Sequence, residues 1–202
     1  MLKFFSSSLV AVFAFSSFNL YSQDNNVVLQ YDQLNIGYSY ADGDLYSHGP
    51  LLEWSERYEN NLLLGLNLGY TFFEDIDLKI LQPGIKLGYV HEFSDSLHLV
   101  PSLGLNFAKT RDWQDDGQSW FLLPSLSLNY AAEDSLELSV GVSYAKPFES
   151  ELNGVDVTDY FESTITGSLG SEYALSNNIG LITRFLFTDA NYGLSVGISI
   201  NN

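Results

Sequence analysis

Three histidines, His48, His91 and His98, are the side chains of this sequence best suited to acid–base chemistry. A hydrolase needs a nucleophile or a water molecule, a histidine base, and an acid that orients the histidine. His48 has the most suitable neighbours, because Asp42 and Asp44 lie shortly before it in what we expect to be a loop. Such neighbours are common by chance in acidic loops. We therefore predict no catalytic residues and no enzymatic activity.

The fragment "DWQDDG", from Asp112 to Gly117, resembles the start of a calcium-binding loop. An EF-hand supplies oxygen ligands at positions one, three and five and a glutamate at position twelve. The first three positions fit loosely, but position twelve is Leu123. Cysteine is absent, which removes thiolate metal sites and disulfides. We predict no metal site and no cofactor, and we interpret the fragment as part of an acidic loop.

Seven charged residues fall on strand faces that otherwise carry glycine and small polar residues. They are Arg57, Lys86 and Arg184, against Glu53, Glu137, Glu162 and Glu172. We expect them to line the inside of a barrel, with Glu53 or Glu137 as the counter-charge of Lys86 and with Arg184 reaching across the interior. The sequence does not distinguish between two states of that interior. Water would screen these charges in an open lumen, whereas close ion pairs would make a rigid plug.

The elements that carry these residues are β-strands, as the stretch "LLLGLNLGYTFF" illustrates. In steps of two, one of its faces is almost entirely leucine and aromatic, and the other carries Gly65, Asn67 and Gly69. A soluble sandwich would place charged residues on the second face. The crowded apolar face therefore points to lipid, and the sparse face points into a confined lumen.

The same alternation predicts ten strands along the chain. We expect them at 34–40, 52–58, 62–73, 80–93, 97–108, 120–130, 136–144, 161–173, 179–187 and 192–200. Short turns alternate with mostly longer links, which is typical of an up-and-down barrel with short periplasmic turns. We also expect a bulge at Gln82–Pro83, because the parity of Leu78 and Ile80 differs from that of the residues after them.

Aromatic residues on the apolar face cluster at the strand ends. The expected outer belt is Tyr40, Tyr70, Phe72, Phe107, Trp120, Tyr144, Phe161, Phe187 and Tyr192, and the expected inner belt is Tyr58, Tyr89, Phe93, Tyr130 and Tyr173. Aliphatic residues fill most of the space between them. Two aromatic belts around an aliphatic band are typical of a protein that crosses a bilayer.

Composition limits the remaining classes. The 202 residues fit one domain, and the formal net charge of −17 with eight lysines and arginines excludes a nucleic-acid binder. The first 22 residues have a lysine, an apolar run and a small-residue end, which predicts a secretory signal peptide cleaved after Ser22, with Ser16 or Ser17 as alternatives. An N-terminal amphipathic or buried helix is the other interpretation. Residues 23–202 are then the exported barrel.

The stretches "LNIGYSYADGD", "IKLGYVHEFSDSLHLVPSLGLNFA" and "YGLSVGISINN" complete a pattern that resembles the small outer-membrane β-barrel proteins of Gram-negative bacteria, a porin-like superfamily. The resemblance implies an all-β, transmembrane up-and-down antiparallel barrel of about ten strands, with eight as the alternative. It also implies a location in the bacterial outer membrane, contact with its lipid and lipopolysaccharide, insertion by the barrel-assembly machinery, and a monomer.

Function stays open among three classes. The first is a narrow porin-like channel for ions or small solutes, which we favour. The second is a structural or surface-interaction barrel with a plugged lumen and no transport, and the third is an outer-membrane hydrolase. The acidic outer loops predict a cation preference for an open channel.

Overall fold

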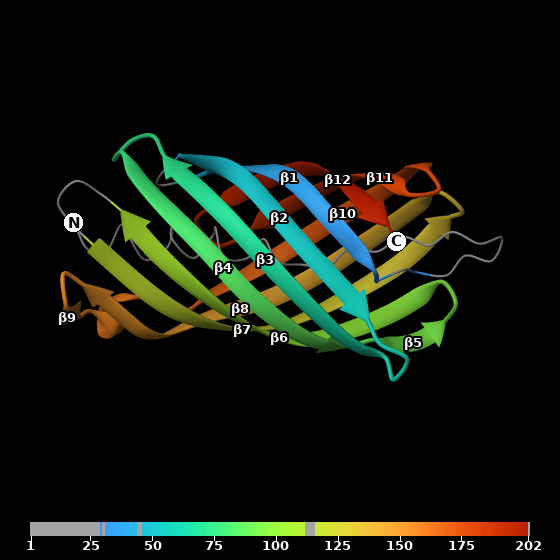
Figure 1. The fold of residues 1–202 in the computed structure, drawn as a ribbon, viewed down its shortest axis with the longest axis horizontal. Coiled ribbons are helices and arrows are strands. Elements are labelled where there is room, and N and C mark those ends of the chain that lie inside the picture. Colours follow the sequence, from blue (N-terminus) through green and yellow to red (C-terminus); the bar gives the residue numbers. More distant parts are fainter. Residues whose placement is uncertain (1–28, 30, 44–45, 112–115, 202) are drawn as a thin grey trace.

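A computed structural model of the chain describes residues 29, 31–43, 46–111 and 116–201 (Figure 1). The expected signal peptide, residue Asp44 and most of the "DWQDDG" fragment lie outside the described residues. Among the residues that are described, no helix is long and apolar enough to cross a membrane.

The described chain is almost entirely β-strand, with one short 3₁₀ helix. The strands are β1 (Gln33–Asp42), β2 (Ser47–Arg57), β3 (Leu62–Phe73), β4 (Leu78–Tyr89), β5 (His91–Ser94), β6 (Leu97–Arg111), β7 (Asp116–Glu133), β8 (Leu136–Leu152), β9 (Val155–Asp156), β10 (Thr164–Ser176), β11 (Ile179–Phe187) and β12 (Tyr192–Asn201). The 3₁₀ helix η1 is Thr158–Tyr160.

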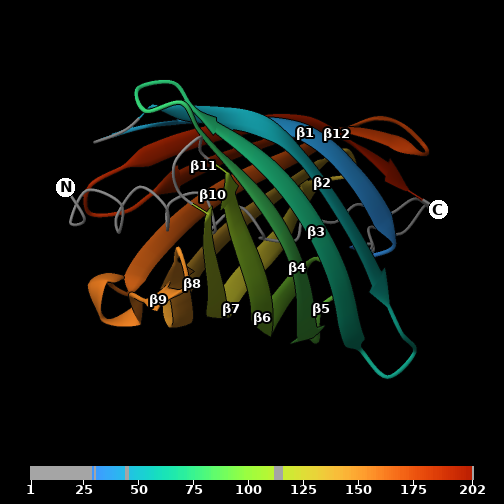
Figure 2. The ribbon, with the colours of Figure 1, turned by 60° about the vertical axis from the view of Figure 1, so that its left-hand side comes forward.

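Ten of these strands form one closed antiparallel barrel (Figures 1 and 2). Strand β1 pairs with β2 on one side and with β12 on the other, and a β8–β10 pairing completes the ring. The short strand β5 continues the line of β4 along β6, and β9 folds back on the end of β8. The ten-stranded prediction is therefore confirmed, and the eight-stranded alternative is wrong.

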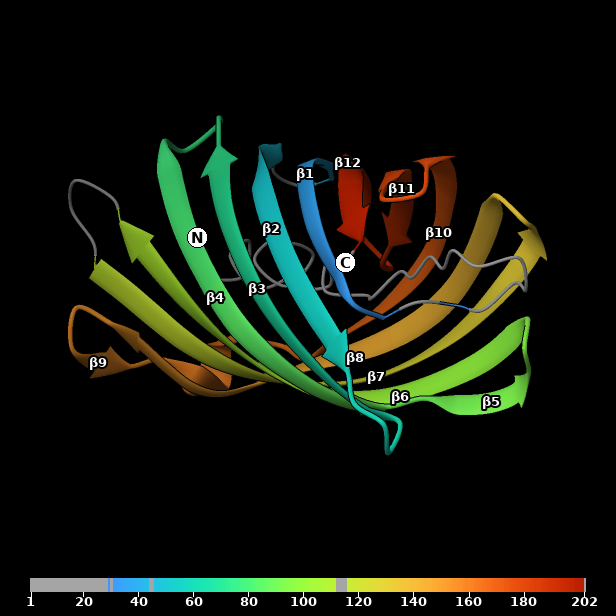
Figure 3. The same cartoon turned by 45° about the vertical axis from the view of Figure 1, so that its right-hand side comes forward.

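The two ends of the barrel differ in their connections. One end, here called the short-turn end, carries the start of β1, the end of β12 and four tight turns. In the first of these turns Asn61 adopts a left-handed conformation, with φ of 64°, and its amide donates to the Tyr58 carbonyl. The other end, the long-loop end, carries the remaining links. Strands β6, β7 and β8 are the longest and project beyond their neighbours there (Figures 1 and 3).

Side chains alternate between the two faces of the barrel wall as predicted. The outward positions of β3 are exposed leucines such as Leu66 and Leu68, whereas Leu63, on the opposite face of the strand, is fully buried. The expected inner belt is exposed at all five positions: Tyr58, Tyr89, Phe93, Tyr130 and Tyr173. The prediction of the outer belt is wrong for one residue, Phe161. Phe161 precedes β10 and packs against the buried interior.

The predicted bulge at Gln82–Pro83 is also wrong. Strand β4 keeps one continuous register against β3 from Leu78 to Tyr89. Because proline has no N–H to donate, pairing with β6 lapses at Gln82–Pro83, and it resumes at Gly84 in the same register. Leu78 and Ile80 consequently point into the barrel. The apolar residues that looked like a parity slip are core residues.

Candidate functional site: the barrel interior

The inward side chains near the long-loop end form an apolar cluster. Its buried members are Phe73, Leu78, Ile80, Ala108, Phe121, Leu123, Ala145 and Leu186. They come from β3, β4, β6, β7, β8 and β11, so the cluster reaches from one side of the barrel wall to the other. We call this group the upper apolar layer.

A second apolar cluster closes the short-turn end. It consists of Leu29, Tyr31, Leu63, Val90 and Val100, with Ala131 packed against it. Leu29 and Tyr31 precede β1, and both are buried inside the barrel. We call this group the lower apolar layer.

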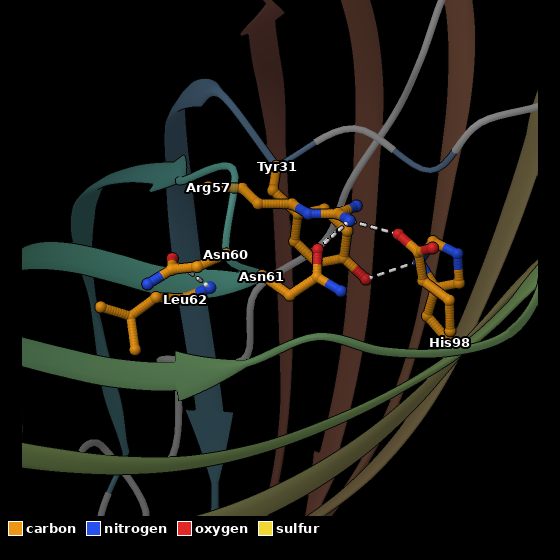
Figure 4. Close-up of polar contacts among 7 residues, drawn as sticks. Tyr31, Arg57, Asn60, Asn61, Leu62 and His98 are labelled. Atoms are coloured by element: carbon orange, nitrogen blue, oxygen red, sulfur yellow. Dashed lines mark hydrogen bonds and ion pairs between the residues drawn. The ribbon is translucent and has the colours of Figure 1, made fainter.

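Polar contacts hold Tyr31 inside this layer (Figure 4). The Tyr31 hydroxyl lies 2.9 Å from Nδ1 of His98, and the two rings are stacked. The guanidinium of Arg57 lies over the Tyr31 ring, 5.3 Å from its centroid, and forms an ion pair with Glu92. Burial raises the pKa of the Tyr31 phenol above its ordinary value, so the group stays protonated at physiological pH. The sequence pattern missed this contact, because Tyr31 lies before the alternation begins.

A polar band lies between the two apolar layers. Along β4 the inward residues run from Ile80 in the upper layer through Lys86, and Val90, directly after the strand, belongs to the lower layer. Along β3 they run from Phe73 through Asn67 to Leu63 in the same way. The band also contains buried Asn35, Gln82, Asn106, Glu53 and Arg184.

An ion pair in this band joins Arg184 of β11 and Glu53 of β2. The Arg184 Nη1 atom donates to Glu53 Oε2 at 2.6 Å, and the two residues are 3% and 6% exposed. Strands β12 and β1 separate the two elements in the sheet, so the pair spans the interior. Lys86 interacts electrostatically with both members.

Two further carboxylates lie side by side on neighbouring strands. Glu137 of β8 is directly opposite Glu172 of β10, and both are buried. The Ser199 hydroxyl of β12 donates to Glu172. Like charges facing each other on adjacent strands are unfavourable when both are ionised, so this part of the interior disfavours two bare carboxylates.

The remaining two residues assigned to the lumen lie at the edges of the barrel. Arg57 is half-buried at the short-turn end, where it contacts Tyr31 and Glu92. Glu162 is exposed and precedes β10, because that strand begins only at Thr164, after η1. The strand predicted from the alternation begins at residue 161, three residues before the start of β10.

Two cavities open into the polar band. One, lined by Lys86 of β4, has hydroxyl groups around it from β7, β8 and β10. The other lies beside the ion pair and is lined by Asn35, Glu53, Arg184 and Ser195 among others. Each cavity has a volume of about 20 Å³, enough for about one water molecule.

His48 does not lie in a loop. It is the second residue of β2 and faces outward, where its ring stacks on Phe72. Its Nδ1 atom contacts the Tyr38 hydroxyl at 2.5 Å, and its Nε2 atom lies 3.0 Å from Glu74 Oε1. Asp42 instead accepts a hydrogen bond from the Tyr192 hydroxyl at 2.8 Å. The expected pairing of His48 with Asp42 is therefore wrong, and Asp44 lies outside the described residues.

The described end of the "DWQDDG" fragment belongs to a strand. Asp116 and Gly117 begin β7, and the Asp116 carboxylate lies 3.8 Å from the ammonium of Lys109. Within residues 29–111 and 116–201, so far as they are described, no three His, Asp or Glu side chains converge closely enough to hold a metal ion.

Comparisons with known proteins agree with this architecture. No protein-family model and no curated protein matches the chain. Among solved structures, the NanC porin matches with a TM-score of 0.53 and 9% identity, over 84% of this chain and 100% of its own. An outer membrane channel from Pseudomonas putida F1 matches with a TM-score of 0.54 and 9% identity, over 89% and 98%. The translocator domain of the autotransporter NalP from Neisseria meningitidis matches with a TM-score of 0.50 and 11% identity, over 99% of each chain.

Likenesses at such low identity concern the fold. Each of these structures is an outer-membrane barrel that matches nearly its whole length to the closed sheet described above. The chain therefore has the fold of the outer-membrane β-barrel proteins, as a closed antiparallel barrel of ten strands.

Proposed function

We propose that this protein is a narrow outer-membrane channel for ions or small solutes, and that the conformation described here is closed. The observation that carries the proposal is the polar band inside the barrel, with buried Glu53, Lys86 and Arg184. An ionisable residue at membrane depth is costly, and it faces a pathway or a binding site when it is retained.

The cost of the band is the main argument against a purely structural interior. An ion pair in a barrel core is usually no more stabilising than apolar side chains of the same volume. The upper apolar layer demonstrates that this chain can fill its interior with leucine, isoleucine and phenylalanine. Charges in the neighbouring band therefore favour a role in contacting solutes.

The two apolar layers close the channel by excluding water from both sides of the polar band. Hydrophobic constrictions gate pores by excluding water, and modest side-chain movement is enough to rewet them. Phe121 in the upper layer and Tyr31 in the lower layer are the largest fully buried side chains of the two clusters. Opening would require both layers to admit water.

A second candidate is a plugged scaffold barrel without transport. The Arg184–Glu53 pair favours it, because a direct 2.6 Å contact between buried charges needs no water to screen it. The apolar layers on both sides of the band are compatible with this alternative as well. The two candidates differ in one measurable property, the ion current.

The test is conductance of the refolded mature chain in a planar bilayer. We expect small, intermittent currents from the wild type and longer open events from Phe121→Ala, which removes one of the two buried phenylalanine side chains of the upper layer. Leu66→Ala is the matched control, since Leu66 faces outward, and its currents should equal those of the wild type. Absence of current from both the wild type and Phe121→Ala would favour the plugged scaffold.

The outward surface supports the proposed surroundings of the barrel. Exposed aliphatic residues between exposed aromatic residues are suited to outer-membrane lipid and lipopolysaccharide. We further propose insertion by the barrel-assembly machinery, a monomeric state, and no enzymatic activity.

A further inference from the structure

We infer that the contact between Tyr31 and His98 is a pH-sensitive latch on the short-turn end of the barrel. Neutral His98 holds Tyr31 inside the barrel, and protonation of His98 in a mildly acidic medium releases it. The inference deepens the channel proposal by naming a condition that opens the lower apolar layer. It rests on that proposal for its effect on ion flow, but not for the movement of Tyr31 itself.

The contact defines the protonation state of the imidazole. Because burial raises the pKa of the Tyr31 phenol, the phenol keeps its proton, and its hydroxyl donates to His98 Nδ1, 2.9 Å away (Figure 4). A ring nitrogen that accepts a hydrogen bond carries no proton of its own. The backbone of Ser94 also forms a hydrogen bond with the ring. His98 is therefore neutral in this structure, with its proton on Nε2.

Release of Tyr31 makes it easier for His98 to bind a proton. Both side chains are buried, and each residue is only 1% exposed. A ring that becomes charged while buried has no water to hydrate it, and its Nδ1 atom is already occupied by the Tyr31 hydroxyl. When Tyr31 leaves, the ring gains both water and a free nitrogen. A ligand shifts a protein toward the state that binds it more tightly, so the proton shifts this barrel toward release.

The charged groups around His98 couple it to a second contact of Tyr31. Glu92 of β5, Asp95 of the following turn and Arg57 of β2 all interact electrostatically with the ring. The two carboxylates belong to the wall and its turn, so they attract a protonated ring whether or not Tyr31 is bound. Glu92 forms an ion pair with Arg57, whose guanidinium lies over the Tyr31 ring. A protonated His98 competes with Arg57 for Glu92, which weakens this second contact as well.

Two further polar side chains face the contact from β7 and β8. Asn129 is directly opposite His98 in the register, and Glu137 interacts electrostatically with Tyr31. If either accepted the hydroxyl proton of Tyr31 when His98 became charged, Tyr31 would stay in place and there would be no latch. Titration of His98 does not distinguish these outcomes, whereas access to the lower apolar layer does.

The experiment measures how fast a charged methanethiosulfonate reagent reaches a thiol introduced as Leu63→Cys in the lower apolar layer. The mature chain is refolded in detergent micelles, and the rate is compared at about pH 7.5 and about pH 5, across the range in which histidine changes its charge. Phe121→Cys, in the upper apolar layer, corrects for the effect of pH on the thiol and the reagent. We expect the rate at Leu63→Cys, relative to Phe121→Cys, to rise several-fold on acidification.

Three variants separate the latch from a general effect of acid. His98→Asn keeps an acceptor oxygen near the position of Nδ1 but does not become charged, so the relative rate should stay low at both pH values. His91→Asn is the matched control, because His91 is an exposed histidine at the same end, and acid should still raise the rate. Tyr31→Phe keeps the ring without its hydroxyl, so the relative rate should already be high at about pH 7.5 and change little with acid.

The proposal is overturned if acid leaves the relative rate at Leu63→Cys unchanged, or if the increase persists in His98→Asn. Loss of the increase in His91→Asn would also overturn it, since the wrong histidine would then be responsible. Thiol access needs no ion current, so the outcomes separate. Acid-dependent access without conductance would leave the latch and remove the channel, and conductance without acid-dependent access would do the reverse.

Discussion

A guanidinium and a carboxylate from distant parts of the chain lie side by side inside this barrel. Arg184 and Glu53 are separated by 131 residues in sequence and by 2.6 Å between donor and acceptor atoms. Removing one member of a buried pair leaves the other charge without its partner, which costs far more than the intact pair contributes. Single and double substitutions at this pair therefore have different expected effects.

We expect Arg184→Met to lower the free energy of unfolding by about 3 kcal/mol, at the low end of the range for a broken buried pair, because Lys86 still interacts with Glu53. The double variant Arg184→Met with Glu53→Leu should be less destabilised than Arg184→Met alone. Urea unfolding of the mature chain in lipid vesicles measures both. Additive losses would mean that the two side chains are not coupled.

A second residue-scale prediction concerns Asp156, which lies in the long-loop region outside the barrel wall. Its carboxylate accepts a hydrogen bond from the Thr158 amide at 2.9 Å, and that bond holds the pKa of Asp156 below its ordinary value of 3.8. A depressed carboxyl pKa gives the folded turn stability that is fully present above the ordinary value. That stability is lost as the pH falls through the lower folded value.

The Thr158 amide signal should therefore titrate with a midpoint below 3.8. A pH series of ¹H–¹⁵N spectra measures the midpoint, and Asp156→Asn is the control in which that transition should vanish. A midpoint at or above the ordinary aspartate value would show that the amide does not stabilise the ionised carboxylate.

At the scale of elements, proline marks the places where neighbouring strands stop pairing. Pairing between β2 and β3 lapses at Gly49 and Pro50 and resumes at Leu51. Gly49 lies so close to β3 that only a residue without a side chain fits, since a β-carbon there would come within 1.8 Å of the Tyr70 carbonyl oxygen. The close approach of the two strands depends on glycine.

We expect Gly49→Ala to destabilise the barrel by about 1–3 kcal/mol, as overpacking against backbone usually does. Gly104→Ala is the matched control, because a β-carbon there would lie 3.4 Å from its nearest neighbour, Leu123, which is an ordinary contact. Urea midpoints of the two variants measure the difference. Equal midpoints would mean that β2 and β3 can separate at Gly49 without cost.

The segment before β1 acts as an element in its own right, because Leu29 and Tyr31 close the short-turn end. The sequence contains no cysteine, so one introduced thiol reports access to the interior. In a Leu63→Cys background, we expect Tyr31→Ala to speed the reaction with a charged methanethiosulfonate reagent at least about tenfold. The same change in a Phe121→Cys background should have little effect. Equal acceleration at both thiols would indicate general unfolding, and no acceleration at Leu63→Cys would show that Tyr31 does not close this end.

At the scale of the whole molecule, closure of the sheet decides where the protein can reside. A closed barrel leaves no strand edge without a partner. A β-sheet can cross the hydrocarbon core of a bilayer only if all its backbone N–H and C=O groups are hydrogen-bonded in this way. Exposed leucine and valine on the wall make the same surface unsuited to water. Both properties fit an outer-membrane barrel.

Fractionated cells should therefore contain the mature chain, without residues 1–22, in the outer membrane. On gels, the unheated protein should migrate faster than the boiled protein, because a folded barrel resists detergent and stays compact. N-terminal sequencing checks the cleavage site. Recovery from the soluble periplasm, with no effect of heating on migration, would contradict this prediction.

The sequence alone determined the wall of the barrel. Alternation with a period of two is a local property, so it correctly placed Leu66 outward and Leu63 inward and predicted all ten strands. The same local pattern placed Glu53, Lys86 and Arg184 on the inner face before any fold was known. It failed where the local pattern was interrupted. At Pro83 the pattern predicts a bulge that the structure lacks, and it places Glu162 in a strand that begins only at Thr164.

Only the tertiary structure decided which inward residues meet. A contact across a barrel depends on the number of strands, their stagger and their tilt, none of which is encoded in the spacing within one strand. The pairing of Arg184 with Glu53 and the stacking of Tyr31 on His98 both depend on that closure. Alternation therefore fixes which side chains point inward, and closure of the sheet decides which of them come into contact.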